Sequence, residues 1–97
     1  MTKTTVRTDD GSPDLIIGRN LTEVARVARN DMGWQRLSTR RWLDRDYREI
    51  VYLSSADLLD AFEDGSVVYL APGVTERDDW YEFEAALLTH RSKTVEL

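Results

Sequence analysis

The chain has 97 residues, 41% of them hydrophobic and 32% charged, which is typical of one globular domain and excludes a largely disordered chain. The absence of cysteine excludes disulfides, thiolate metal sites and thiol nucleophiles, and it favours a cytoplasmic location. The net charge of −5 disfavours general binding to nucleic acid, because an acidic protein repels the phosphates.

Residues 1–13 are polar and predict a flexible arm or a short edge strand, followed by a single α/β domain over residues 14–97. The first residues carry no signal-peptide pattern, and no apolar run in the chain is long enough to span a membrane. Within the domain one pattern occurs three times: a short apolar run, a capping residue and then a helical period.

The first of these units begins with the apolar run Leu15–Ile17, which predicts a strand. Asn20 is a favoured helix N-cap, and Glu23 follows at the spacing of a capping box. Gly33 supplies the residue at which the predicted helix ends.

The second and third units have the same form. Residues 50–53 predict a strand that leads through Ser54 and Ser55 into a short helix. Residues 67–70 predict another strand, and Thr75 is the expected N-cap of the last helix, whose first turn is acidic. The tail that follows this helix, from residue 92, is expected to fray.

The strands predict the fold class. Their apolar runs show no alternation, which is typical of parallel strands buried on both faces. Residues 34–48 do not fit the repeated unit, and we expect an added strand within 35–43 and a turn at 44–46. The sequence therefore predicts an α/β fold with a small, mostly parallel sheet of about four strands and three helices.

Parallel strands bring their carboxyl ends to one edge of a sheet, where ligands bind in open α/β folds. Only Gly18 of the three-glycine dinucleotide motif is present, and no lysine lies between Lys3 and Lys93, which excludes a P-loop. The remaining hypothesis is that polar residues at this edge bind a simple anion. The alternative is that they only cap helices. The candidate anion-binding residues are Arg19, Asn20, Ser54, Ser55, Gly73 and Thr75.

Charge is divided unevenly along the chain, with a net +4 over residues 19–48 and a net −8 over residues 49–97. Arginine, tryptophan and tyrosine are common anchors of protein interfaces, and they also stack on bases and grip phosphates. A third interpretation of this arginine- and aromatic-rich stretch is a surface strand whose tryptophans pack into the core. If the stretch binds a protein, one candidate partner is a second copy of the chain. The candidate partner-binding residues are Arg36, Arg40, Arg41, Trp42, Arg45 and Tyr47.

No catalytic set is recognisable. The nucleophile elbow G-x-S-x-G is absent, and His90, the single histidine, has no orienting partner that the sequence identifies. Without cysteine or a second histidine, no metal site and no cofactor are expected.

The segments DLIIGRNLTEVARVARN, IVYLSSADLLDAF and VVYLAPGVTERDDWYEFEAAL resemble, in this order, small Rossmann-like α/β proteins of actinobacteria and their phages that lack the P-loop. The resemblance spans about residues 14–91. It implies a cytoplasmic accessory protein, such as a phage product that acts on a host protein. We therefore expect a non-enzymatic protein–protein interaction module; the alternatives are an anion or nucleotide binder at the sheet edge and a nucleic-acid accessory protein.

Overall fold

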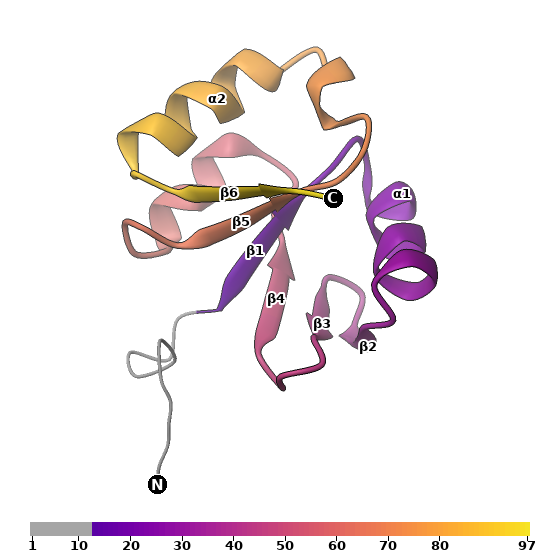
Figure 1. The fold of residues 1–97 in the computed structure, drawn as a ribbon. Coiled ribbons are helices and arrows are strands. Elements are labelled where there is room, and N and C mark those ends of the chain that lie inside the picture. The colour runs from indigo at the N-terminus through magenta and orange to yellow at the C-terminus, as the bar shows by residue number, and fades with distance from the viewer. Residues whose placement is uncertain (1–12) are drawn as a thin grey trace, which may run out of the picture.

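Figure 1 shows the computed structural model of the chain, which describes residues 13–97. The arm predicted over residues 1–13 lies outside the described residues, except for Pro13. The elements in chain order are β1 (Asp14–Ile17), α1 (Leu21–Arg26), the π-helix η1 (Val27–Asp31), β2 (Gln35–Ser38), β3 (Arg41–Leu43), β4 (Glu49–Tyr52), the 3₁₀-helix η2 (Ala56–Ala61), β5 (Val67–Leu70), the 3₁₀-helix η3 (Val74–Glu76), α2 (Trp80–Thr89) and β6 (Lys93–Glu96).

The strands form one mixed sheet in the order β2-β3-β4-β1-β5-β6. β1 lies parallel to β4 and β5, and β6 lies parallel to β5, whereas β3 is antiparallel to both β2 and β4. The α/β class and the three strands of the repeated unit are confirmed. The prediction of a mostly parallel sheet of about four strands is wrong, because the sheet has six strands and is mixed. The segment that did not fit the repeat forms the β2–β3 hairpin, which folds back on β4.

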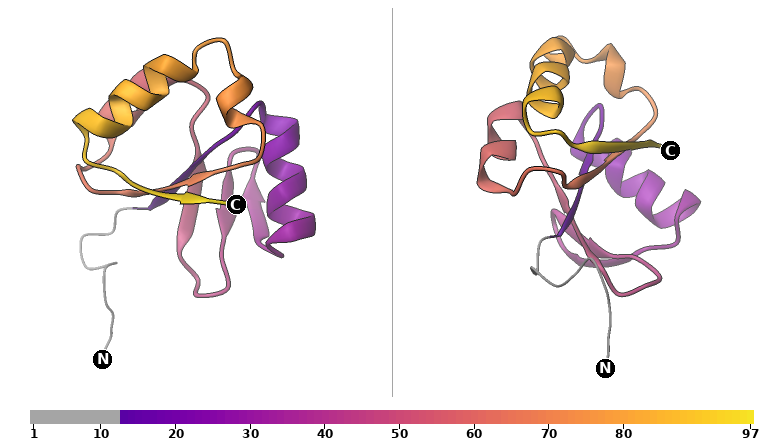
Figure 2. Two further views of the ribbon diagram at one scale, coloured as in Figure 1. Left: turned by 45° about the horizontal axis from the view of Figure 1, so that its top comes forward. Right: turned by 60° about the vertical axis from the view of Figure 1, so that its left-hand side comes forward.

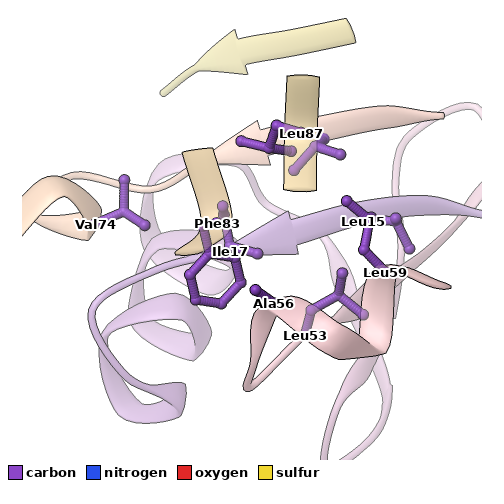
Figure 3. Close-up of a cluster of buried hydrophobic side chains, with 9 residues drawn as sticks. Leu15, Ile17, Leu53, Ala56, Leu59, Val74, Phe83 and Leu87 are labelled. Atoms are coloured by element: carbon purple, nitrogen blue, oxygen red, sulfur yellow. The ribbon is translucent and has the colours of Figure 1, made fainter. Parts of the chain in front are cut away.

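β1 is buried along its whole length between two apolar clusters. Leu15 and Ile17 belong to a cluster with Phe83 and Leu87 of α2 and with residues of η2 (Figure 3). Ile16 belongs to the other cluster, which α1 covers. Figures 1 and 2 show α1 on one side of the sheet and α2 on the other. A strand that is covered on both faces needs apolar side chains at successive positions, which explains the unbroken apolar run.

The first helical segment follows the prediction at both ends. Asn20 caps α1, because its side-chain Oδ1 accepts a hydrogen bond from Glu23 N at 2.9 Å. α1 then continues without a break into η1, whose wider turn is closed by the bond from Met32 N to Val27 O at 3.0 Å. Gly33 follows with a φ of 68°, in the left-handed region that glycine adopts most easily.

The last helical segment is divided in two. η3 is a separate turn that starts after Gly73, which has a φ of 88°. Arg77 has an extended backbone (φ −66°, ψ 143°), so the chain leaves helical geometry before α2 begins, with Asp79 at its N-cap. The prediction that Thr75 caps the last helix is therefore wrong, because Thr75 lies inside η3.

The tail does not fray as predicted. Arg91 takes a φ of 53° and turns the chain back after α2, so that residues 93–96 pair with β5 as the edge strand β6. Hydrogen bonds from Lys93 N to Ser66 O and from Leu97 N to Leu70 O, both 2.9 Å long, extend this pairing to both ends of β5. All four side chains of β6 are exposed, so no apolar pattern marks the strand in the sequence.

Candidate functional site

The loops that follow β1, β4 and β5 meet at one edge of the sheet, as the parallel strands predict; we call this edge the rim. The side chain of Arg77 joins them directly. Its Nη1 donates to the Gly18 carbonyl at 2.9 Å, and its Nη2 donates to the Ser54 carbonyl at 3.0 Å. Arg77 itself belongs to the segment after β5, so one guanidinium links the ends of all three strands.

Arg77 already carries its own counterion. Its Nε and Nη2 bond to the two carboxylate oxygens of Asp79 at 2.8 and 3.0 Å, and its guanidinium carbon lies 4.8 Å from the centre of the Phe83 ring. The hydrogen bond to Asp79 raises the pKa of Arg77, and the same bond lowers the pKa of Asp79. Sequence analysis missed Arg77, because it stands among the acidic residues that suggested a helix start.

The six predicted anion-binding residues do lie along this rim, but several of their polar groups have intramolecular partners. Asn20 Oδ1 is used as the helix cap, and Ser55 Oγ donates to Asp57 Oδ1 at 2.6 Å. Arg19 lies 3.8 Å from a Glu76 carboxylate oxygen and packs beside Gly73. Ser54 contributes its carbonyl to Arg77, and Thr75 is exposed on η3.

Gly18 serves packing at the helix–strand junction. A Cβ atom at this position would lie 2.4 Å from Val24 Cγ2 and 3.1 Å from Ala71 Cβ. The residue therefore lets α1 approach the end of β1 closely, which is one of the roles that glycine has in nucleotide-binding folds and which requires no ligand. A hollow of about 200 Å³ lies beside Gly73 and Trp80 at this rim.

The predicted partner-binding residues lie on and beside the β2–β3 hairpin. Trp42 is only 1% exposed and belongs to the apolar cluster beneath α1. Arg36 lies over its ring at 5.4 Å and donates to the Ser38 and Thr39 carbonyls at 3.1 and 2.7 Å. Trp42 therefore packs in the core beneath Arg36, and Arg36 is exposed to solvent.

The other four residues of this set are exposed. Arg41 forms an ion pair with Glu49 on the neighbouring strand β4. The guanidinium of Arg45 lies against Gly33, and Tyr47, at the turn before β4, is 83% exposed with a φ of 61°. Arg40 is at the hairpin turn, where its carbonyl accepts a hydrogen bond from Tyr52 N at 2.9 Å.

A groove of about 780 Å³ lies between the hairpin, β4 and η2. Its apolar lining includes Val51 of β4 together with Leu58 and Phe62 from the η2 segment, and Leu58 is 40% exposed. Arg40 and Arg41 line the same space on the hairpin side. We call this feature the hairpin groove; it combines exposed apolar surface with guanidinium groups, which is the composition of many protein-binding surfaces.

His90 has two partners that the sequence did not identify. Its Nε2 lies 2.8 Å from Asp60 Oδ1, and its Nδ1 lies 2.9 Å from Asp64 Oδ1. These hydrogen bonds, with Asp60 first and Asp64 second, raise the pKa of His90. Hydrogen bonds from both ring nitrogens to carboxylates favour the protonated form, whereas a general base acts from the neutral form. The partners are 30 and 26 residues away in sequence, so no local pattern indicates them.

Within residues 13–97, no three histidine, cysteine or acidic side chains are grouped so that they would hold a metal ion. No helix in this part of the chain has the length and apolar character that crossing a bilayer requires. No family model, no curated protein and no solved structure matches the chain, so the resemblance to proteins of actinobacteria and their phages stays a prediction.

Proposed function

We propose that the chain is a non-enzymatic protein-binding module and that the hairpin groove receives a partner segment with both apolar and acidic side chains. The observation that carries the proposal is the composition of the groove: Leu58 and Phe62 offer apolar surface next to Arg40 and Arg41. Burial of the apolar part would supply affinity, and the arginines would orient an acidic partner. If the resemblance to phage proteins holds, this partner is a protein of the host cell.

The rim supports the rival hypothesis of an anion or nucleotide binder less well. The guanidinium that joins the three loops is already bonded to the Asp79 carboxylate, and Arg19 has Glu76 as a neighbour. An incoming anion would have to compete with these carboxylates. In the hairpin groove Arg41 is likewise paired with Glu49, but Arg40 has no ion pair among the described residues, and the apolar lining needs no counterion.

Affinity capture from the cell that encodes the chain tests the proposal with two groove variants, Leu58→Glu and Arg40→Glu. The matched controls are Leu88→Glu and Arg91→Glu, which change exposed residues of the same types outside the groove. Circular dichroism and a thermal melt verify that each variant is folded.

We expect one set of captured proteins to be lost with both groove variants and kept with both controls. A truncation or peptide scan of that partner should then locate the contact in an acidic segment with apolar residues. If the captured proteins are the same for all five chains, or if the controls lose them as well, the groove is not the binding surface.

A further inference from the structure

We propose that a second pocket, on the opposite face of the hairpin, binds a small phosphate monoester. This pocket has a volume of about 460 Å³, within the usual range of small-ligand sites of roughly 300–1,000 Å³. It lies between the α1–η1 helix and the hairpin, and we call it the arginine pocket. The side chains that carry the argument are Arg26, Arg29, Asn30, Trp34, Arg36 and Trp42.

The arginine pocket is positively charged in an otherwise acidic chain. Three arginines and one asparagine line it, and no acidic residue does, although the whole chain has a net charge of −5. Guanidinium groups match the oxygens of a phosphate with paired hydrogen bonds, and several of them together are a common phosphate-binding arrangement. A pocket with this lining attracts an anion by its charge.

The three arginines differ in how they are held. Arg36 is fixed by its position over Trp42 and by its bonds to two backbone carbonyls, which use its Nε and Nη2. Arg26 forms an ion pair with Glu23 on the same helix. Arg29 is exposed and makes no ion pair or side-chain hydrogen bond recorded within residues 13–97, so its charge is available to a ligand.

The α1–η1 segment brings three polar residues to the pocket. Arg26 ends α1, Arg29 and Asn30 follow within η1, and all three line the pocket. This stretch also passes from α1 into the π-helix η1. π-helical turns are rare, and they occur frequently at functional sites.

The aromatic walls favour a small monoester over a nucleic-acid strand. Trp34 is 8% exposed with Tyr69 against it at 5.2 Å, and Trp42 is 1% exposed beneath Arg36. Neither indole therefore offers a free face on which a base would stack, as single-stranded nucleic acid requires. The acidic remainder of the chain also repels a long polyanion more strongly than one phosphate group.

Isothermal titration calorimetry with three monoesters (ribose 5-phosphate, glycerol 3-phosphate and O-phosphoserine) tests the proposal. Inorganic phosphate and ribose serve as reference ligands, and a short single-stranded oligonucleotide tests the competing class. The variant is Arg29→Gln, which leaves the fold intact because Arg29 has no internal bond to lose among the described residues. The matched control is Arg91→Gln, an exposed arginine that lines neither the arginine pocket nor the hairpin groove.

We expect at least one monoester to bind more tightly than inorganic phosphate, and Arg29→Gln to weaken it about tenfold or more, as the loss of one charge-assisted hydrogen bond predicts. Arg91→Gln should leave this affinity unchanged. The proposal is overturned if none of the three monoesters binds, if ribose or inorganic phosphate binds as well as they do, if both variants weaken binding equally, or if the oligonucleotide binds more tightly than every monoester.

Discussion

Replacing Gly18 with alanine should destabilise the protein by a steric effect that can be calculated from its surroundings. The new methyl group would lie 2.4 Å from Val24 Cγ2 and 3.1 Å from Ala71 Cβ, both well inside normal contact distance. Val24 and Ala71 are buried at 0% and 2% exposure, so neither side moves into solvent to relieve the clash. Gly18 is not among the glycines with positive φ, which leaves overpacking as the dominant cost. Overpacking a core costs about 1–3 kcal/mol, and we expect about 2 kcal/mol here.

Urea denaturation of the wild type, Gly18→Ala, Val24→Ala and the double variant measures this cost. Val24→Ala removes the methyl group that clashes, so the double variant should lose at least ~1 kcal/mol less than the sum of the two single losses. Gly65→Ala is the matched control: it has a φ of 82° but no atom within 4 Å of the added methyl, so its loss should be additive with Val24→Ala. Additive losses for Gly18 and Val24, or a neutral Gly18→Ala, would refute the packing explanation.

Arg77→Met should lower the free energy of unfolding by about 2–3 kcal/mol in urea titrations, because it leaves two carbonyl acceptors and a carboxylate without their donor. Since Arg77 lowers the pKa of Asp79, the stability from this pair is present above pH 3.8 and is lost as the pH falls through the lower folded pKa; Asp79→Asn should therefore flatten the acid limb of a stability–pH curve. Conversely, the raised pKa of His90 contributes stability that is complete below pH 6.5 and lost as the pH rises through the folded pKa. Thermal melts from about pH 6 to about pH 9 should thus show a smaller decline for His90→Gln than for the wild type, and an equal decline would contradict the assignment. Trp42→Ala should cost about 3–5 kcal/mol in the same denaturation assay, as expected for an aromatic side chain that is 1% exposed, and a loss under 1 kcal/mol would show that it is not a core residue.

Local patterns predicted the centre of the sheet, indicated one added strand within 35–43 where the structure has the β2–β3 hairpin, and missed β6. The central strands β1, β4 and β5 are covered by helices, and strands buried in this way have continuous apolar runs in their sequences. At the edges, β2 and β6 expose all of their side chains, so no apolar pattern marks where these strands begin and end. Their place in the sheet depends on backbone pairing with a neighbour, which a single sequence does not reveal.

The candidate sites likewise contain residues that the sequence predicted and residues that it did not. Asn20 was predictable because a cap and its partner are three residues apart. Arg77 bridges 59 residues to Gly18 and 23 to Ser54, so its role at the rim appears only in three dimensions. The arginine pocket likewise joins residues of α1–η1 to the hairpin, and only its hairpin members, Arg36 and Trp42, were among the predicted partner-binding residues.

The position of β1 between the two apolar clusters has a consequence for the order in which the protein opens. Its amide hydrogens become accessible only when both faces of the sheet are lost, so hydrogen exchange at Leu15, Ile16 and Ile17 should require global unfolding. The exposed strands β2 and β6 protect their amides with pairing on one side alone, and they should exchange through local fraying. The hairpin that borders both the hairpin groove and the arginine pocket is therefore among the least protected parts of the sheet, and a ligand in either place would be seen first as slower exchange there.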